Sequence, residues 1–498
     1  MKSLGKKARL EQAAFSRAPL GWTATMDVEF AKRVLANLSA PTLQEILQYL
    51  RRVPAHRWGT ACSGSESPSW ALKALWEAVS TSYGQEVGER ADDPFEHVYA
   101  AESEPTKREW ISQKTVPLFL FSDIFDLTRV SAYCDLAGKD VKVVEVGDID
   151  QFIAGFSCKN VSGLSNDDEG RRAAISEYRG STGWTWWGVV LVVQKQRPKC
   201  FVLENVEGLM WHGGHLLVVA KLRSLGYVVI WRLSNALDCG VPQNRSRIWF
   251  VGWRRDLIVD VESFTRLLEQ TMEECFNDHP MMSLDDALLP EDHPFVLEAD
   301  DVAGASSSMR SPPSTVSLTK TKGMRKWVDK ARQREKKQTR HLPAHTHWRP
   351  ELECVYPAYK KLPERCRQLL DGMDVRFPEV VATIVRLDQS EAGKGVDQIP
   401  CITPSGMFWA AHQCRLLQGY ELMRLQGFVL ADSDLDKWPS RFLQDLAGNS
   451  FCVFSGLVFI LVGVTGLAAA AAQRKLGADL IRSLQFVPGM DESDSDGE

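Results

Sequence analysis

Apolar runs of strand length alternate with helical patterns through the first half of the chain. This alternation is typical of a parallel sheet whose strands are joined by crossover helices. Two later runs lie close together, at 227–233 and 247–253, and predict an antiparallel pair at one edge of that sheet. The four earlier runs lie at 97–102, 118–125, 141–148 and 199–206.

The pattern changes near residue 256. An acid-rich stretch is followed by a Ser/Pro-rich stretch at 303–317, and then by ten Lys or Arg residues between Lys320 and Arg340. This order predicts a linker and then a helix with a positive face, which is either simply solvated or a contact for nucleic-acid phosphates. A globular pattern resumes near residue 348 and becomes helical at 415–428.

One apolar segment, residues 451–472, contains 22 residues without a charge. It is about long enough to cross a bilayer. Its Gly and Ala content also suits close packing in a protein core, and we expect a buried helix and no membrane contact.

The composition is that of an ordinary globular chain, with 44% hydrophobic and 25% charged residues. The net charge is −5, and the last eight residues contain five acids and no base. Because the rest of the chain is neutral, a globally basic domain is excluded, and a nucleic-acid partner would need a local basic patch. Eleven cysteines form no C-x-x-C pair, so we expect neither a disulfide scaffold nor a bound metal, and an intracellular protein.

The first candidate site is the segment 60–79, a short apolar lead, a Ser/Gly turn and a helix. Ser67 is the expected N-cap, and Pro68 the first helical residue. The amides of such a turn favour an anionic ligand, and Gly64 permits close approach next to Ser63. The alternative is an ordinary connection between a strand and a helix.

Two acidic residues, Glu102 and Asp123, end strand-like runs that should lie beside the first strand. Ligands bind at this edge of a doubly wound sheet. The two carboxylates could accept hydrogen bonds from a ribose and an adenine, or they could simply cap the helices that follow.

The second candidate site centres on Cys158, which follows an apolar strand end and is flanked by glycines. A lone cysteine is either a small buried hydrophobe or a nucleophile. Glu204 and Asn205 interrupt another apolar strand at its end, where a carboxylate is rarely left without a partner.

A third piece, Gln243, Arg245 and Arg247, precedes the last strand and could aim donors into the same cleft. Taken in order, these segments resemble the cytosine-5 DNA methyltransferase family. The matching motifs are the cofactor turn, the Cys loop, ENV at 204–206, QNRSR at 243–247, RLQGF at 424–428 and GN at 448–449. The resemblance covers about residues 56–255 and 400–470.

The resemblance implies a Rossmann-like class I methyltransferase α/β sheet with an antiparallel edge hairpin and a smaller inserted target-recognition domain. It also implies S-adenosylmethionine as cofactor and a flipped cytosine of DNA as substrate. The implied catalytic residues are Cys158, Glu204, Arg245 and Arg247; the cofactor-binding residues are Ser63, Gly64, Glu102, Asp123 and Asn449; the substrate-binding residues are Asn205, Gln243, Lys320, Lys322, Arg325 and Lys326.

On this basis we expect five regions. Residues 1–55 are an N-terminal extension, 56–255 and 401–485 form the catalytic domain, 256–400 are the target-recognition region, and 486–498 are a disordered acidic tail.

The chain departs from the family at four positions. Glu66 and Ser67 stand where small residues are usual in the cofactor turn, Ser157 where a proline precedes the nucleophile, and Lys159 where a glutamine follows it. These departures put the affinity for the cofactor and the mobility of the Cys loop in question.

Three other functions compete with methylation of DNA. An RNA cytosine-5 methyltransferase shares the motifs, although the basic insert is long for that type, and a catalytically silent nucleic-acid-binding protein would fit the altered turn. An NAD-dependent oxidoreductase would lack its G-x-G-x-x-G motif and would leave ENV and QNRSR unexplained. A DNA substrate and the basic run predict a nuclear location; the oligomeric state is open.

Overall fold

A computed structural model of the 498-residue chain describes residues 25–88, 92–162 and 168–289 continuously. It also describes most of 383–485, with short gaps, and the isolated residues 293, 362 and 366. The expected basic contacts Lys320, Lys322, Arg325 and Lys326 lie outside the described residues.

Within the described residues, nine strands form one mixed sheet in the order β5-β4-β3-β2-β1-β6-β7-β10-β8. The five central strands, β3 to β7 in this order, are parallel, while β4 and β5 at one edge and β10 and β8 at the other run antiparallel to their neighbours. The strands are β1 His56–Ala61, β2 Phe95–Ala101, β3 Phe119–Phe121, β4 Ser131–Cys134, β5 Lys139–Lys142, β6 Gln151–Gly155, β7 Cys200–Val206, β8 Tyr227–Asn235 and β10 Ser246–Arg254.

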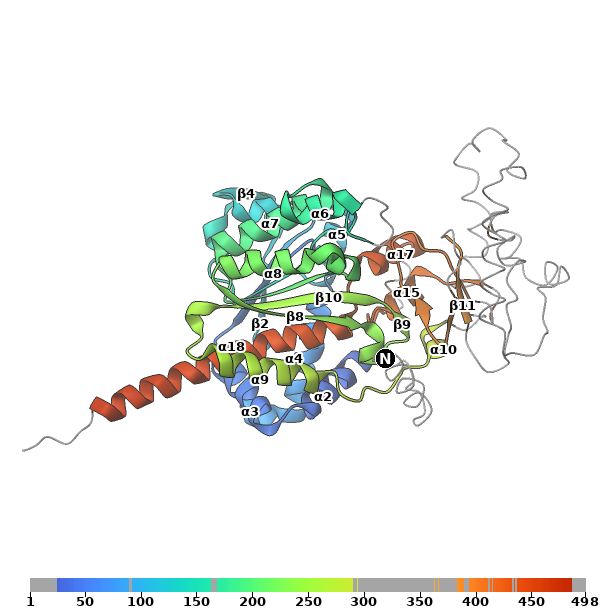
Figure 1. Cartoon of the computed structure of the whole chain (residues 1–498). Coiled ribbons are helices and arrows are strands. Elements are labelled where there is room, and N and C mark those ends of the chain that lie inside the picture. The colour runs from blue at the N-terminus through green and yellow to red at the C-terminus, as the bar shows by residue number, and fades with distance from the viewer. Residues whose placement is uncertain are drawn as a thin grey trace, which may run out of the picture.

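Helices cover both faces of this sheet (Figure 1). One core joins the sheet to α2, α3, α4, α9 and α18, and the other joins it to α6, α7 and α8. The expected α/β class with an antiparallel edge hairpin is therefore confirmed. The helices are α2 Met26–Asn37, α3 Ala40–Arg52, α4 Ser67–Val87, α5 Pro105–Lys114, α6 Asp168–Ser176, α7 Gly180–Gln196, α8 Gly214–Ser224, α9 Val261–Cys275 and α18 Val453–Gln485.

Two of the predicted strands are wrong in part. The run at 118–125 is a strand only over Phe119–Phe121, because Asp123 caps a short 3-10 helix at Ile124–Thr128. The run at 141–148 ends as a strand at Lys142, and that strand, β5, pairs antiparallel at the edge of the sheet. The residues that follow it form another 3-10 helix, Val143–Val146.

The apolar segment at 451–472 forms most of α18. Length and composition would allow this helix to span a membrane, but the whole of its most apolar stretch is buried inside the protein. On the sheet side, Phe459 stacks on Trp249 of β10 with ring centroids 4.6 Å apart, and Gln151 of β6 donates to the carbonyl of Ile460 at 3.2 Å. As expected, the segment is a core helix of the fold.

A smaller sheet lies beside the main one (Figure 1). It has the order β12-β11-β14-β15, and a separate two-residue strand, β13, pairs parallel with β9 of the main body. The helix predicted at 415–428 is shorter than expected, because its first residues form β15. These elements are β9 Gln243–Asn244, α10 Leu284–Ala287, β11 Thr383–Arg386, β12 Lys394–Val396, β13 Ile399–Pro400, β14 Phe408–Ala410, β15 Arg415–Leu416, α15 Gly419–Arg424 and α17 Ser440–Asn449.

A buried ion pair holds Leu289, at the end of the described segment 168–289. Glu421 accepts from Arg415 at 2.7 Å and from the backbone amide of Leu289 at 2.7 Å. Arg415 in turn donates to the carbonyl of Leu289 at 2.9 Å. We call these three residues the exit clamp, because Leu289 is the last residue described before residue 293.

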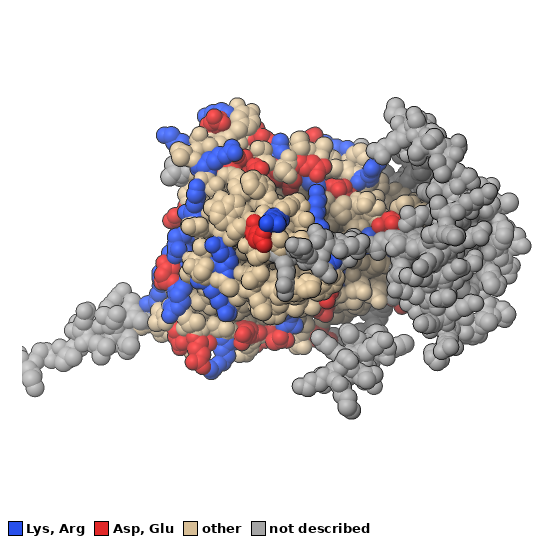
Figure 2. Space-filling model, turned by 45° about the horizontal axis from the view of Figure 1, so that its top comes forward, with Lys and Arg blue, Asp and Glu red and all other residues tan. Residues whose placement is uncertain are grey.

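Surface charge agrees with the neutral composition of the body. Figure 2 shows Lys and Arg interspersed with Asp and Glu on the face that it presents. On this face the described residues therefore do not make a single basic patch.

A first prediction concerns the fit of α18 against the sheet. A Cβ atom on Gly466 would lie 2.2 Å from the indole nitrogen of Trp253, which donates to the carbonyl of Gly463 at 3.0 Å. We expect Gly466→Val to lower the free energy of unfolding by about 1–3 kcal/mol, measured by urea denaturation.

The control for this prediction is Gly84→Ala in α4, where a Cβ atom meets nothing within 4 Å. This variant should be as stable as the wild type, or more stable by up to about 1 kcal/mol. Equal stability of Gly466→Val and Gly84→Ala would contradict the described packing of α18.

Candidate active site

One pocket opens at the carboxyl ends of the central strands, the edge where ligands bind in a doubly wound sheet. Its volume is about 320 Å³, including its open mouth. The residues that line it come from the turn after β1, from β6 and β7, and from the connection between α17 and α18. They are Thr60, Ala61, Cys62, Ser63, Ser67, Pro68, Ile153, Ala154, Gly155, Glu204, Asn449, Ser450 and Phe451.

The turn after β1 has a left-handed backbone at three positions, with φ of 53° at Cys62, 55° at Gly64 and 60° at Glu66. Only glycine adopts this conformation without strain. A Cβ atom on Gly64 would approach no atom closer than the carbonyl oxygen of Asn449, at 3.8 Å, so the turn is open at this residue.

The first helix after this turn begins differently from the prediction. Ser67 is the first residue of α4, and Glu66 takes the N-cap position without a capping side-chain hydrogen bond. The predicted N-cap role of Ser67 is therefore wrong. The Ser67 hydroxyl donates instead to the carbonyl of Phe451 at 3.0 Å, which joins the turn to the start of α18.

Glu66 points away from the pocket into the protein. Its side chain is completely buried, and it accepts a hydrogen bond from the Thr60 hydroxyl at 2.5 Å. Burial raises the pKa of Glu66 to about 8, although hydrogen bonds from Thr60 and Ser63 act in the opposite direction. The acidic residue that departs from the family pattern therefore does not block the pocket.

The expected cofactor-binding residues lie around this turn. Glu102 follows β2 and accepts from the amides of Gly64 at 2.8 Å and of Glu104 at 3.0 Å. Asn449 lines the pocket, and its amide donates to the carboxylate of Asp445 at 3.1 Å.

Asp123 caps the 3-10 helix after β3, accepting from the Phe125 amide at 2.9 Å. The capping alternative for Asp123 is thus observed. The Asp123 carboxylate comes just after β3. This strand lies beside β2 in the sheet, and Glu102 comes just after β2.

The loop that carries Cys158 is held by two hydrogen bonds just before the cysteine. The Ser157 amide donates to the Thr185 hydroxyl at 2.9 Å, a bond that the proline usual in the family could not make. The Asn205 amide donates to the carbonyl of Phe156 at 2.9 Å. The hydrogen bond from Ser157 offsets the freedom that loss of the proline would give the loop.

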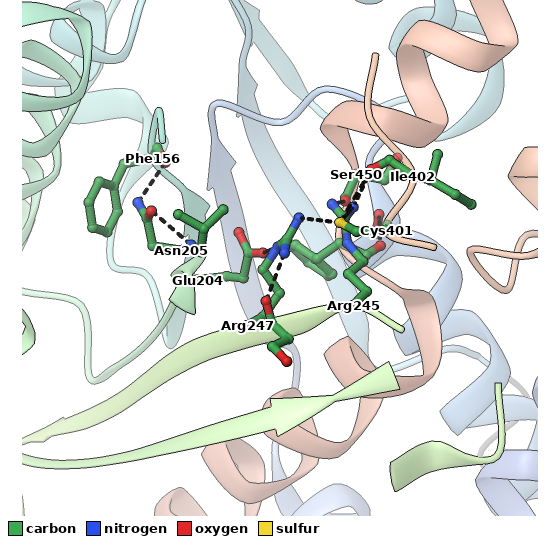
Figure 3. A network of polar contacts seen from close by, with 12 residues as sticks. Phe156, Glu204, Asn205, Arg245, Arg247, Cys401, Ile402 and Ser450 are labelled. Carbon is green, nitrogen blue, oxygen red and sulfur yellow. Dashed lines mark hydrogen bonds and ion pairs between the residues drawn. The ribbon is translucent and has the colours of Figure 1, made fainter. Parts of the chain in front are cut away.

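Glu204 and Arg247 form the central ion pair, with Nε of Arg247 2.8 Å from Oε1 of Glu204. In the antiparallel pairing of β7 and β10, Arg247 lies opposite Val206, and so diagonally across from Glu204 on one face of the sheet. Figure 3 shows the Arg247 guanidinium between the Glu204 carboxylate and the sulfur of Cys401.

Arg245 is almost completely buried and connects distant parts of the chain. Its guanidinium donates to the carbonyl of Ile402 at 2.7 Å and to the carbonyl of Ser450. Burial and the neighbouring Arg247 lower the pKa of Arg245. Because these contacts join the residues before β10 to the segments at Ile402 and Ser450, Arg245 holds these three parts of the site together.

The charges of Arg247, Glu204 and Arg245 all affect the pKa of the Cys158 thiol. Burial raises the pKa of Cys158, Arg247 and Arg245 lower it, and Glu204 raises it. The two arginines therefore favour the thiolate form that a nucleophile needs.

Two expected substrate contacts, Asn205 and Gln243, do not line the pocket. Both are buried, and Gln243 donates to the carbonyl of Leu425 at 2.7 Å. In this structure both amides are used to position neighbouring segments.

Two residues of the site were not predicted from the sequence. Cys401 contacts both arginines, and the carbonyl of Ser450 contacts Arg245. Neither residue lies in a motif quoted above. Their position after the inserted region was the available signal. Among the described residues, no group of His, Cys, Asp and Glu could hold a metal ion.

Comparisons with known proteins identify the family of this chain. A sequence model described as C-5 cytosine-specific DNA methylase matches residues 91–451, which is more than half of the chain. The chain is 25% identical over 428 residues to the DNA (cytosine-5-)-methyltransferase DMT5 of Cryptococcus neoformans, a match that covers 82% of this chain and 17% of that protein. It is also 37% identical over 126 residues to the type II methyltransferase M.NlaIV of Neisseria lactamica, covering 23% of this chain and 28% of that protein.

Among solved structures, the Dnmt2 methyltransferase of S. pombe matches with a TM-score of 0.39 and 13% identity, covering 82% of this chain and 97% of that one. The two curated relatives are matched over less than a third of their own length. The fold and the pocket define an α/β protein with a Rossmann-like sheet and a Cys–Glu–Arg group near the pocket that the turn after β1 lines. The chain belongs to the C-5 cytosine-specific DNA methylase family, which confirms the resemblance drawn from its motifs.

A second prediction follows from the burial of Glu66. Since its pKa in the folded protein is about 8 and its ordinary value is 4.5, the folded protein keeps a proton that the unfolded chain releases between these pH values. The contribution of Glu66 to the stability of the wild type should therefore fall as the pH rises from 4.5 to 8. Glu66→Gln has no such proton, and its stability relative to the wild type should increase with pH by at most about 1.4 kcal/mol per pH unit.

Urea denaturation at pH 6 and pH 8.5 measures this difference. The control is Glu109→Gln on the exposed side of α5, which should follow the wild type at both pH values. Parallel pH dependence of the wild type and Glu66→Gln would show that Glu66 is not held protonated.

Proposed function

We propose that this protein transfers a methyl group from S-adenosylmethionine to carbon 5 of a flipped cytosine in DNA through a covalent adduct with Cys158. The observation that carries the proposal is that one pocket is lined by Ser63 of the turn after β1, by Ser67 of α4 and by Glu204 of β7. Direct methyl transfer requires both reactants in one cavity. Membership of the family supports the choice of cytosine in DNA.

The residues around the turn fit S-adenosylmethionine. Gly64 leaves open space above the backbone, and the N-terminus of α4 faces the same pocket through Ser67 and Pro68. Glu102 and Asp123 would accept hydrogen bonds from the ribose and the adenine, as the family pattern implies. When bound, S-adenosylmethionine supplies an electrophilic methyl group.

Cys158 would act as the nucleophile. Its thiolate adds to carbon 6 of the cytosine, which makes carbon 5 electron-rich enough to accept the methyl group. Because burial disfavours the thiolate, the positive charges of Arg247 and Arg245 are needed to stabilise it. Removal of the proton from carbon 5 by a base then allows elimination and restores the free thiol.

Glu204 would hold the base at ring nitrogen 3 and at the exocyclic amine. There it stabilises the charge that develops on the ring. The ion pair with Arg247, at 2.8 Å, fixes the orientation of the Glu204 carboxylate before the base arrives. With DNA as the substrate, we also propose a nuclear location.

A third prediction tests the function directly. Purified protein is incubated with S-adenosylmethionine and DNA or RNA oligonucleotides that contain 5-fluorocytosine, whose fluorine blocks the final elimination. We expect a covalent adduct with DNA that requires both the cofactor and Cys158, and none with Cys158→Ala. The adduct is measured as a gel shift that survives denaturation.

A control for loss of a thiol elsewhere in the protein is Cys134→Ala, on β4, the strand next to the edge of the sheet. It should form the adduct at the wild-type rate. A stronger adduct with RNA would make this an RNA methyltransferase. No adduct with either nucleic acid, from folded protein that binds both, would point to the catalytically silent alternative.

A fourth prediction concerns the ion pair. Arg247→Gln removes the charge that favours the Cys158 thiolate and leaves Glu204 without its partner. We expect the rate of adduct formation to fall by about 10²-fold or more. Arg254→Gln is the matched control, because Arg254 lies at the other end of β10 and pairs with Asp256 at 3.0 Å. Equal rates for the two variants would exclude the proposed role of Arg247.

A further inference from the structure

Cys401 lies beside the candidate site in the loop after β13 and is partly exposed. Its sulfur is 3.6 Å from Nη1 of Arg245 and 3.8 Å from Nη2 of Arg247, both within the range of hydrogen bonds to sulfur. A cysteine in contact with two guanidinium groups is unlike the other cysteines of the site, and none of the steps proposed above uses it.

Arg247 is shared between two partners. Its Nε faces Glu204 at 2.8 Å, while its Nη2 faces Cys401 on the opposite side (Figure 3). Nη1 donates to the carbonyl of Ser246 at 2.7 Å. The guanidinium is therefore held at three points, by Glu204, the Ser246 carbonyl and Cys401.

The charges of Arg245, Arg247 and Glu204 explain why a sulfur that can become negatively charged suits this position. Arg245 and Arg247 bring two positive charges into a nearly buried region, where Glu204 supplies one negative charge. A buried cluster with unequal charges is costly. A thiolate at Cys401 would balance it and leave Cys158 as a neutral thiol before the substrate binds.

The remaining charges near Cys401 do not change this balance. Arg386 donates to the backbone carbonyl of Cys401 at 3.0 Å, and its own charge is matched by Asp388 at 2.9 Å. Arg247, Arg245 and Arg386 lower the pKa of Cys401 although burial raises it, whereas the net effect at Cys158 is a raised pKa.

We propose that Cys401 is a positioning residue of this site, whose anionic sulfur is the second partner of Arg247 and holds its guanidinium against Glu204. The inference rests on the proposed function only in assigning Glu204 and Arg247 to the binding of the base. The state of the two thiols can be measured without any methyl transfer.

The test measures thiol alkylation at Cys401 and Cys158 separately. The full chain is treated with iodoacetamide at a series of pH values, and mass spectrometry gives the rate for each cysteine. We expect the rate at Cys401 to reach its midpoint at a lower pH than the rate at Cys158. The reverse order would overturn the proposal, whatever the activity of the protein.

Variants show whether Cys401 acts through its charge. In Cys401→Ser, the charge of Arg247 is no longer balanced and acts more strongly on Cys158. The alkylation midpoint of Cys158 should therefore move down by roughly 0.5–1 pH unit. Cys401→Asp restores a fixed negative charge and should return the midpoint to the wild-type value, whereas Cys401→Ala should resemble Cys401→Ser.

The matched control is Cys134→Ser. Cys134 lies on β4, at the opposite side of the sheet from Arg247 of β10, and the variant should leave the midpoint of Cys158 unchanged. A purely structural role for Cys401 predicts no shift in Cys401→Ser and no rescue by Cys401→Asp, and either result would overturn the proposal. Failure of the 5-fluorocytosine adduct combined with the expected shifts would sink the proposed function alone.

Discussion

The buried guanidinium of Arg245 is the interaction on which the arrangement of the site depends. It brings together three segments that are far apart in the sequence: the hairpin strand that carries Arg247, the loop at Ile402, and the junction of α17 and α18 at Ser450. A buried charge of this kind is stabilised when its donors are used, and here both Nη atoms donate to backbone carbonyls, one at Ile402 and one at Ser450. Removing either of these two segments would leave one Nη atom without its acceptor. The second half of the chain must therefore fold back onto the first before the pocket is complete.

Much of this could be predicted from the sequence because it depends on local patterns. The runs before Glu102 and Glu204 and the pair of strands around Arg247 are strands in the structure, and motif order identified the family. The details that could not be predicted depend on packing across the chain. The direction of the Glu66 side chain, the contact of Cys401 with the arginines, and the 3-10 helix after Phe121 result from neighbours that no spacing reveals.

The two departures from the family pattern that raised the strongest questions are both accommodated by hydrogen bonds. The Glu66 side chain is buried and accepts a hydrogen bond from Thr60. It does not line the pocket, so the pocket keeps its lining of small residues there. Ser157 uses an amide that proline lacks to bond to Thr185 of α7. Each replacement carries its own stabilising contact, and the altered residues therefore do not by themselves argue for an inactive protein.

The exit clamp has a consequence for how the number of residues after Leu289 can change. Leu289 and Arg415 are more than a hundred positions apart in sequence, yet both bond to Glu421. The two ends of the stretch between them are therefore held together whatever its length. The entropy of closing a flexible loop grows only with the logarithm of its length, so doubling a flexible insertion would cost only about 0.6 kcal/mol. Evolution can change the number of residues between Leu289 and β11 at this small cost, whereas the loop at Ile402, to which Arg245 donates, has to be kept.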